Sequence, residues 1–443
     1  MRQRDLQTRE IEDDSSEHPA QPRPPVNRRT AASGAVAALL ALALGVATFA
    51  MVSAYRPTRS ATGASTAGTP TAALSPTAAA SPTQGLKRGA GLPKGVEVSM
   101  FALTGADEGW GTGVVVANAV NSVADRSMVL RYSSGSWTQV GPALRGVYLG
   151  GMDMVSPSEG WVIGGDSYGN TLLLHIHNGA WRQVSLPAAD PQGAPRLMAM
   201  RTPDEGWMVM ANAYGAPGGP NTSLLHYAGG VWSLVHTGVW HITDVAPVAD
   251  GEAWVTGSNT NGTSSLVHVR GGKATVELTS PGNSVFSRLR MFAPNDIWIE
   301  GAMHASTNAD IDDSPLVYHF DGVTWSKVDL HATTSAQHIG IVASDTAWAF
   351  ASSEPPPPLE ATAYGRISRI YSNEGGQWQT LSMPYRDLQS LEVVSSSSAD
   401  IWAVGVYMVT IRLPNHNGAP SYAGISHYVL LRYTGGVWTE YGR

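Results

Sequence analysis

From residue 96 onward the chain consists of short runs in which apolar and polar residues alternate, separated by turns rich in glycine. One such unit contains the runs RLMAMRT (196–202), GWMVMANA (206–213), SLLHYA (223–228) and VWSLVH (231–236). Alternation with a period of two is typical of β-strands, and the Gly-Gly pair between the last two runs indicates a tight hairpin. This unit therefore predicts four antiparallel strands.

The same unit occurs seven times between residues 96 and 443. Its first signature is a tryptophan that follows an acidic turn, found at Trp110, Trp161, Trp207, Trp254, Trp298, Trp348 and Trp402. A second signature such as LHYAGGVW or LRYTGGVW follows each one, and together the two account for every tryptophan except Trp240. A four-stranded sheet cannot bury both of its faces alone, whereas seven sheets around an axis cover one another. The sequence thus predicts an all-β, seven-bladed β-propeller, with four strands in every blade and closure by packing of the first blade on the last, without a borrowed strand.

The residues before 96 predict three further segments. Residues 1–30 are polar and predict a disordered cytoplasmic tail. Residues 31–55 carry no charge and as a helix would span about 37 Å, enough to cross a bilayer as a transmembrane helix. A cleaved signal peptide ending at the VSA of 52–54 is the alternative. Residues 56–95 are rich in Thr, Ala, Ser and Pro and predict a linker that holds the propeller away from the membrane on its extracytoplasmic side.

The composition of the chain excludes several kinds of site and disfavours one kind of partner. The chain has no cysteine, which excludes disulfides, thiolate metal sites and cysteine nucleophiles. Its 14 tryptophans stand beside only 6 phenylalanines and 48 glycines, a mixture that favours short strands and turns over helices. Residues 96–443 hold 17 Lys and Arg against 29 Asp and Glu, a net charge of −12, and a field of that sign disfavours nucleic acid as a partner.

The stretches SADIWAVG (398–405) and LLRYTGGVW (430–438) resemble the bacterial DIWAVG/GWxxG repeat propellers, which are often described as kelch-like or galactose-oxidase-like. That resemblance implies a secreted or membrane-anchored propeller without an assigned activity. There is looser similarity to photosystem II assembly-factor propellers, through GW..G followed by a DGG.TW-type turn. The Ser-x-Asp-x-Gly-x-x-Trp box of sialidases is not complete anywhere in the chain.

An acid stands two residues before the first-signature tryptophan in six copies: Glu108, Glu159, Glu205, Glu252, Asp296 and Asp400. In the sixth copy Asp345 stands one residue earlier. A single SEGW turn resembles a glycosidase site, but repetition spaces these carboxylates around a ring, whereas glycosidase carboxylates lie within about 5–9.5 Å. We therefore expect the acids to accept hydrogen bonds from turn N–H groups and the adjacent tryptophans to pack between blades.

His175 and His177 form an HxH pair, which on a strand places both rings on one face and can suit a metal. The position six residues before the second tryptophan, however, holds Arg131, His175, His226, His268, His319 and Arg432 in six of the copies. A position that accepts His or Arg so regularly belongs to the repeat. The sequence accordingly predicts no metal site and no cofactor.

Two groups of residues do not repeat. Asp310, Asp312 and Asp313 lie in the NADIDD segment (308–313), where a solvated loop is favoured over a calcium site because the glycine and the downstream glutamate of an EF-hand are missing. Trp240 and His241 connect the third and fourth copies, and they are either a ligand platform or a partly buried loop anchor.

Loop length varies most between the second and third strands of each copy, and the longest such loop is 408–426 in the seventh. In a propeller these loops open on one face, so they predict a binding surface on a rigid scaffold. We expect a non-enzymatic, membrane-anchored extracytoplasmic propeller that binds a protein or glycan. The alternative is a hydrolase or lyase for a surface glycan, with Asp310, Asp312 or Glu360 near the channel mouth.

Overall fold

The computed structural model describes residues 87–441 with short gaps, namely 90, 117–123, 167–169, 186–193, 212–220, 304–313, 330–335, 344–345, 353–366, 375–376, 382–387, 398 and 417–418. The predicted cytoplasmic tail, the predicted transmembrane helix and most of the predicted linker lie outside these residues. Within the described part of the chain, no helix is long and apolar enough to span a bilayer.

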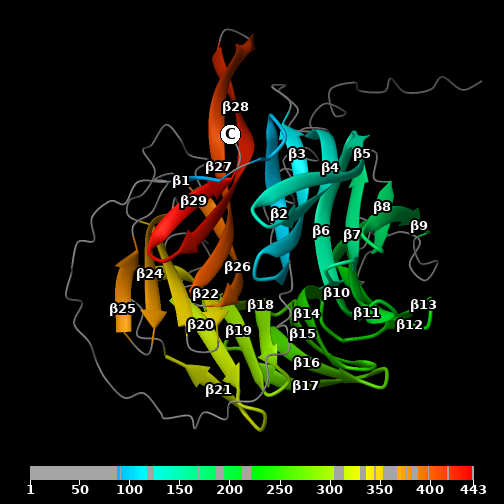
Figure 1. Cartoon of the computed structure of the whole chain (residues 1–443). Coiled ribbons are helices and arrows are strands. Elements are labelled where there is room, and N and C mark those ends of the chain that lie inside the picture. Colours follow the sequence, from blue (N-terminus) through cyan, green and yellow to red (C-terminus); the bar gives the residue numbers. More distant parts are fainter. Residues whose placement is uncertain are drawn as a thin grey trace, which may run out of the picture. The chain divides into compact units, whose positions relative to one another are not determined.

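The described residues form seven antiparallel four-stranded blades (Figure 1). The innermost strands are β2 (Val96–Gly105), β6 (Val147–Ser156), β10 (Ala194–Thr202), β14 (His241–Ala249), β18 (Ser284–Ala293), β22 (Ala336–Ala343) and β26 (Leu388–Ser397). The second strands are β3 (Glu108–Val116), β7 (Glu159–Asp166), β11 (Glu205–Ala211), β15 (Glu252–Ser258), β19 (Asp296–Met303), β23 (Thr346–Ser352) and β27 (Asp400–His416). The third strands are β4 (Ala124–Ser133), β8 (Thr171–His177), β12 (Thr222–Ala228), β16 (Ser264–Arg270), β20 (Ser314–Phe320), β24 (Ile367–Glu374) and β28 (Ala419–Thr434). The outermost strands are β5 (Ser136–Arg145), β9 (Ala180–Val184), β13 (Val231–Val235), β17 (Lys273–Thr279), β21 (Trp325–Val328), β25 (Gln377–Leu381) and β29 (Val437–Tyr441).

Successive blades pack through their innermost strands, and the last blade returns to the first. The strand pairs β2 and β6, β6 and β10, β10 and β14, and β14 and β18 lie side by side, as do β22 and β26 and, across the closure, β26 and β2. Blade 5 meets blade 6 where β19 and β20 lie against β22. The seven-bladed propeller predicted from the repeats is therefore confirmed.

Closure differs from the prediction in one respect. A short strand β1 (Lys87–Arg88), inside the segment predicted to be a free linker, pairs in parallel with the outer edge of β29 through Lys87–Thr439 and Arg88–Glu440. The backbone N–H of Gly89 extends the pairing by donating to the carbonyl of Glu440 at 2.7 Å. Each blade owns its four strands as predicted, but blade 7 gains a fifth from the chain that precedes blade 1, so the expectation of no borrowed strand is wrong.

Glycine turns close the outer hairpins as the sequence predicts. At 134–135, 178–179, 229–230, 271–272 and 435–436, both turn residues have positive φ, between 49° and 86°. Two such residues in succession form a type I′ turn, whose twist matches the right-handed twist of the strands it joins. The Gly-Gly and Asn-Gly pairs of the second signature therefore hold the two outer strands of a blade in register.

The hydrophobic core is divided among the contacts between neighbouring blades. Seven buried clusters are present among the described residues, and each of them combines side chains of two adjacent blades. Every cluster contains one first-signature tryptophan, for example Trp207 between blades 3 and 4 and Trp402 between blades 7 and 1. Trp402 lies 4.8 Å from the ring of Phe101 and 5.0 Å from that of Tyr132 in blade 1. The prediction that these tryptophans pack between blades is thus confirmed.

The acid and the His/Arg position of the repeat, recognised separately in the sequence, meet in the structure. Because the tryptophan of the second strand pairs with the His or Arg of the third, as in Trp207–His226, the two side chains share one face of the blade. The acid two residues earlier lies on that same face. In blade 3 the His226 ring stacks on Trp207 at 4.3 Å and its Nε2 lies 3.0 Å from Glu205 Oε1.

This arrangement, a ring stacked on tryptophan and paired with an acid, recurs around the propeller. The contacts between the side chain and the acid are His175–Glu159 at 3.5 Å, His268–Glu252 at 2.7 Å, His319–Asp296 at 2.9 Å and Arg432–Asp400 at 2.6 Å. In blade 1, Arg131 lies over the Trp110 ring at 5.7 Å. The acids also accept turn N–H groups, as predicted: that of Asn178 reaches Glu159 at 3.4 Å and that of Gly251 reaches Glu205 at 3.3 Å. Their principal partners are the His and Arg side chains.

Blade 6 provides an internal comparison. Its acid, Asp345, is displaced by one residue, and Thr346 stands two residues before Trp348. The residue paired with Trp348 is Ser372, where the other blades have His or Arg. Trp348 is nevertheless fully buried between blades 6 and 7. The tryptophan is therefore the constant element of the repeat, and the His or Arg is present only where the acid stands two residues before the tryptophan.

Glu205 gives a direct test of the acid's role. It is buried and receives Arg201 Nε at 2.8 Å, His226 Nε2 at 3.0 Å and the Gly251 N–H of the next blade. We expect Glu205→Gln to lower the free energy of unfolding by about 1–3 kcal/mol, since the charged acceptor is lost while its three half-buried donors remain. Chemical denaturation measures this, with the exposed Glu277→Gln as control, for which we expect a change within about 0.5 kcal/mol. Equal stability of the two variants would show that the acid is dispensable.

Candidate functional site

The HxH histidines belong to the scaffold. His177 Nδ1 lies 2.6 Å from Glu159 Oε1, and His175 stacks on Trp161 at 4.2 Å beside the same carboxylate. Burial lowers the pKa of His175, and Glu159 partly opposes this effect. Within the described ranges no group of three His, Asp or Glu side chains is placed to hold a metal. Glu159, with the appearance of a catalytic acid, therefore pairs with the two histidines of its own blade.

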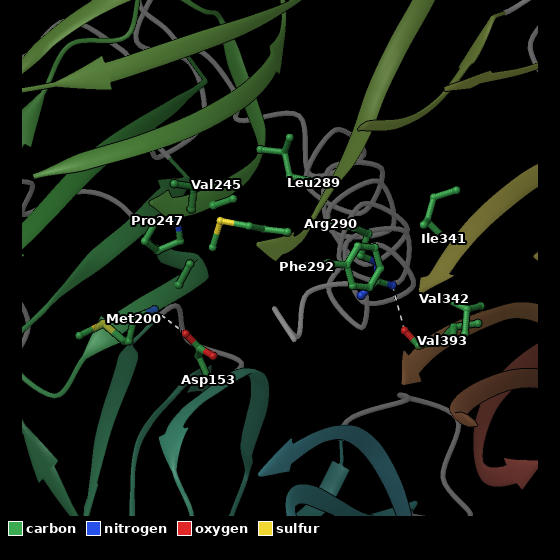
Figure 2. A pocket seen from close by; sticks show the side chains of 13 residues that line it. Asp153, Met200, Val245, Pro247, Leu289, Arg290, Phe292, Ile341, Val342 and Val393 are labelled. Atoms are coloured by element: carbon green, nitrogen blue, oxygen red, sulfur yellow. Dashed lines mark hydrogen bonds between the residues drawn. The ribbon is translucent and has the colours of Figure 1, made fainter. Parts of the chain in front are cut away.

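The channel lining contains charges that repeat analysis did not single out. Asp153 and Arg290 occupy equivalent positions on the innermost strands β6 and β18. Asp244, Arg288 and Glu392 occupy the position two residues earlier on β14, β18 and β26. Arg290 is buried, with Nε 3.3 Å from Glu300 Oε1, and its Nη2 donates to the carbonyl of Val393 in blade 7 at 2.9 Å (Figure 2). Arg288 lies 3.4 Å from Glu392, so blades 5 and 7 are joined directly across the channel.

Buried acids of the two inner strands of a blade, Asp153 and Asp244 on innermost strands and Glu300 on the second strand β19, also bind the backbone of the next blade. Asp153 accepts the N–H of Met200, Asp244 accepts that of Leu289 at 2.8 Å, and Glu300 accepts that of Ile341 at 2.7 Å. Burial raises the pKa of Asp244 to about 6, against the lowering effect of these N–H groups and of nearby arginines. These contacts fix the position of each blade relative to the next along the propeller axis.

The space left inside this network is small. Asp153, Met200, Leu289, Arg290 and Val393 line a cavity of about 30 Å³ between blades 2 to 7 (Figure 2). Such a volume admits one or a few water molecules, whereas pockets for small ligands occupy about 300–1,000 Å³. The interior at this level is therefore structural, and a ligand of ordinary size has to bind elsewhere on the described surface.

Trp240 and His241 lie where the chain enters the innermost strand of blade 4. Trp240 is half-buried, its N–H donates to the carbonyl of Ser258 at 3.1 Å and its own carbonyl accepts the N–H of Asn221 at 2.8 Å. His241 is the first residue of β14, and a guanidinium nitrogen of Arg196 in blade 3 donates to its ring. Burial, with a smaller effect of Arg196, lowers the pKa of His241 to about 4. The predicted pair thus meets an arginine that the sequence analysis passed over.

Asp310, Asp312 and Asp313, together with Glu360, lie outside the described residues, so their roles stay predictions. The segment 408–426, predicted to be a loop, is instead mostly strand. Beyond Tyr407, the last residue of β27 that pairs with β26, the two strands β27 and β28 continue as a two-stranded ribbon through the pairs from Met408–Ser426 to His416–Ala419 (Figure 1). The prediction of a long loop is wrong because both arms of this segment pair with each other.

The root of this ribbon is held by blade 1. Oε1 of Glu97 in β2 lies 2.6 Å from Nδ1 of His427. Oε2 of the same side chain accepts the backbone N–H of Tyr428 at 2.8 Å. The His427 ring stacks on Tyr407 at 5.3 Å. Burial raises the pKa of Tyr428 to about 12, with Glu97 adding to the effect. The ribbon therefore leaves the propeller from a fixed base rather than from a free loop.

No protein-family model and no curated protein matches this chain. Solved structures resemble it in fold. A puromycin hydrolase S511A mutant is 9% identical over 80% of this chain and 53% of its own, with a TM-score of 0.48. YCF48 from Cyanidioschyzon merolae is 14% identical over 77% and 97%, with a TM-score of 0.45, and the Swd1 β-propeller domain from Myceliophteria thermophila is 9% identical over 75% and 98%, with a TM-score of 0.40. The chain spans about half the length of the puromycin hydrolase, and identities this low say nothing about activity or partners.

The buried Asp244 predicts a pH dependence of stability. Its folded pKa of about 6 exceeds the ordinary aspartate value of 3.8, so the folded state binds the extra proton between these values. Stability contributed by this group is therefore largest below about pH 4 and falls as the pH rises to about 6. Denaturant unfolding of the wild type and of Asp244→Asn at pH 4, 5, 6 and 7 measures this. We expect the variant to gain on the wild type as the pH rises, and a constant difference would contradict the shifted pKa.

Proposed function

We propose that the chain is a non-enzymatic binding scaffold that captures a macromolecular partner, a protein or a glycan, on the face of the propeller that carries the β27–β28 ribbon. The ribbon is the observation that carries this proposal. A two-stranded ribbon without a third strand is marginally stable in water. Its unpaired edges present backbone N–H and C=O groups to which an incoming strand can add.

The opposite face offers less to a partner. Its turns keep nearly one length in all seven copies, and its acids are engaged by His and Arg in blades 2, 3, 4, 5 and 7. The channel between the faces is occupied by the Arg290 network and leaves a cavity of about 30 Å³. Charge on both of these surfaces is already engaged in contacts inside the propeller. The ribbon face thus has the larger share of variable structure.

For its setting, we propose attachment to the cell membrane by residues 31–55, with an extracytoplasmic propeller and a cytoplasmic N-terminus. The absence of charge in that segment supports this. The resemblance to bacterial anchored repeat propellers of unassigned activity agrees with both parts of the proposal.

Removing the ribbon tests the function. Joining Met408 to Ser426 through Asn-Gly replaces it with a two-residue turn that suits the paired strands. Chemical cross-linking and affinity capture of the full-length chain in its native membrane identify the bound partner by mass spectrometry. We expect the deletion to reduce its recovery at least about ten-fold, a loss of about 1.4 kcal/mol in binding, with the melting temperature nearly unchanged.

The matched control is Glu159→Gln, which changes the opposite face and should leave recovery intact. The proposal fails if the ribbon deletion recovers the same partner at the same yield. It also fails if Glu159→Gln abolishes capture in a folded protein. The partner would then bind the face opposite the ribbon, which carries the acidic turns and is called the turn face.

A further inference from the structure

The innermost strand of every blade contains a β-bulge near its beginning, where one residue has no partner in the second strand. In blade 3 that residue is Arg196, between the paired positions Pro195 and Leu197. The equivalent residues of the other blades are Ser99, Gly150, Thr243, Ser287, Gln337 and Gln389. Arg196 is thus the single charged residue among seven equivalent positions. A residue that the repeat required would recur, and this one does not.

The bulge itself is satisfied without a charge. Ser99 Oγ lies 2.9 Å from Thr112 Oγ1, Thr243 Oγ1 donates to the carbonyl of Phe286 at 2.6 Å, and Ser287 Oγ donates to that of Glu300 at 3.0 Å. These short side chains find acceptors inside the scaffold. The long guanidinium of Arg196 therefore has no counterpart in the packing of the other blades.

Arg196 also differs in its contacts from two arginines of the innermost strand β18 and one of the second signature, each of which pairs with an acid. Arg290 pairs with Glu300, Arg288 with Glu392 and Arg432 with Asp400. Among the residues that the structure describes, no carboxylate pairs with Arg196, whose guanidinium meets the His241 ring and lies 3.4 Å from its Nδ1.

An arginine has five N–H donors, and a neutral imidazole supplies one acceptor. With its pKa lowered to about 4, His241 is neutral at pH 7 and cannot compensate the charge. Burying a cation without a counter-ion is costly, and burial lowers the pKa of Arg196 itself. A half-buried guanidinium in these surroundings is stabilised most by an anion that comes from outside the scaffold.

The position of Arg196 lets such an anion reach it. Arg196 is the third residue of β10 and His241 is the first residue of β14, so both stand at the strand ends that open on the ribbon face. The half-buried Trp240 immediately precedes His241. The cation and an aromatic residue are therefore adjacent on the face proposed to bind the partner.

We propose that Arg196, with His241 and Trp240 beside it, is the receptor for a single carboxylate carried by an aspartate or glutamate side chain of a protein partner. A guanidinium binds a carboxylate through two parallel hydrogen bonds, which gives direction as well as attraction. The net charge of −12 over residues 96–443 repels a chain of sugar acids with many charges but acts little on one carboxylate at contact. This inference rests on the proposed function and names the chemistry of its partner.

The probe is N-acetyl-glutamate α-amide, which carries one side-chain carboxylate, and its neutral control is N-acetyl-glutamine α-amide. The readout is the ring signal of His241 in the NMR spectrum of the full-length chain labelled at histidine, assigned by its loss in His241→Gln. We expect the signal to move saturably with the glutamate compound up to about 100 mM in the wild type, since binding of one exposed carboxylate is weak. It should not move with the glutamine compound or in Arg196→Gln.

The matched variant is Arg270→Gln, which removes an exposed arginine elsewhere and should respond as the wild type does. Without a ligand, we expect Arg196→Gln to melt at the same temperature as the wild type or higher, because an uncompensated cation is removed. A melting temperature several degrees lower would overturn the proposal, since the guanidinium would then be structural. Equal responses to the two compounds, or a response to trigalacturonate at a ten-fold lower concentration, would overturn it as well.

This result and that of the ribbon deletion are independent. If the glutamate response is present while the ribbon deletion still captures the partner, the carboxylate receptor stands and the ribbon is not the binding element. If the response is missing while the ribbon deletion loses capture, the scaffold function stands and Arg196 has no part in recognition.

Discussion

A tryptophan that packs into the next blade is the contact on which the structure depends. A four-stranded sheet has two faces, and neither can be left in water at the hydrophobicity these strands have. Each of the seven buried clusters holds one such tryptophan, from Trp110 between blades 1 and 2 to Trp402 between blades 7 and 1. Because the core exists only between blades, no blade is stable alone, and the ring must close for any interface to be complete.

Polar groups refine this packing rather than create it. Blade 6 keeps Trp348 fully buried although Ser372 replaces the His or Arg, so burial of the ring does not require the cation. In blades 3, 4, 5 and 7 the His or Arg lies over the indole and bonds the acid, so both polar groups have a partner at that end of the blade. The turn face is consequently occupied by internal contacts, while the strand ends at the ribbon face are less constrained.

The repeats made the architecture predictable, because blade number, strand number and the packing role of the tryptophans follow from spacing and alternation. Other features were not accessible to that reasoning. The meeting of Glu205 with His226 depends on cross-strand register, and the β1–β29 pairing depends on two residues without any periodic signal. The ribbon was taken for a loop because it lies in the connection of variable length between the second and third strands, whereas its two arms pair over most of their length. Asp244 and Arg290 escaped notice because the equivalent positions of the other blades hold residues of different kinds, so no repeat signal marks them.

Repetition within one chain separates what the fold needs from what it does not. Glu159 has the chemistry of a catalytic acid, but its equivalents occur around the ring, and its contacts lie within its own blade. Arg196 has an ordinary sequence context, yet the six equivalent bulges do without a charge. A scaffold position that must be filled the same way seven times cannot at the same time be adapted to one ligand. The position that departs from the repeat at a cost in desolvation is where selection for something other than folding has room to act.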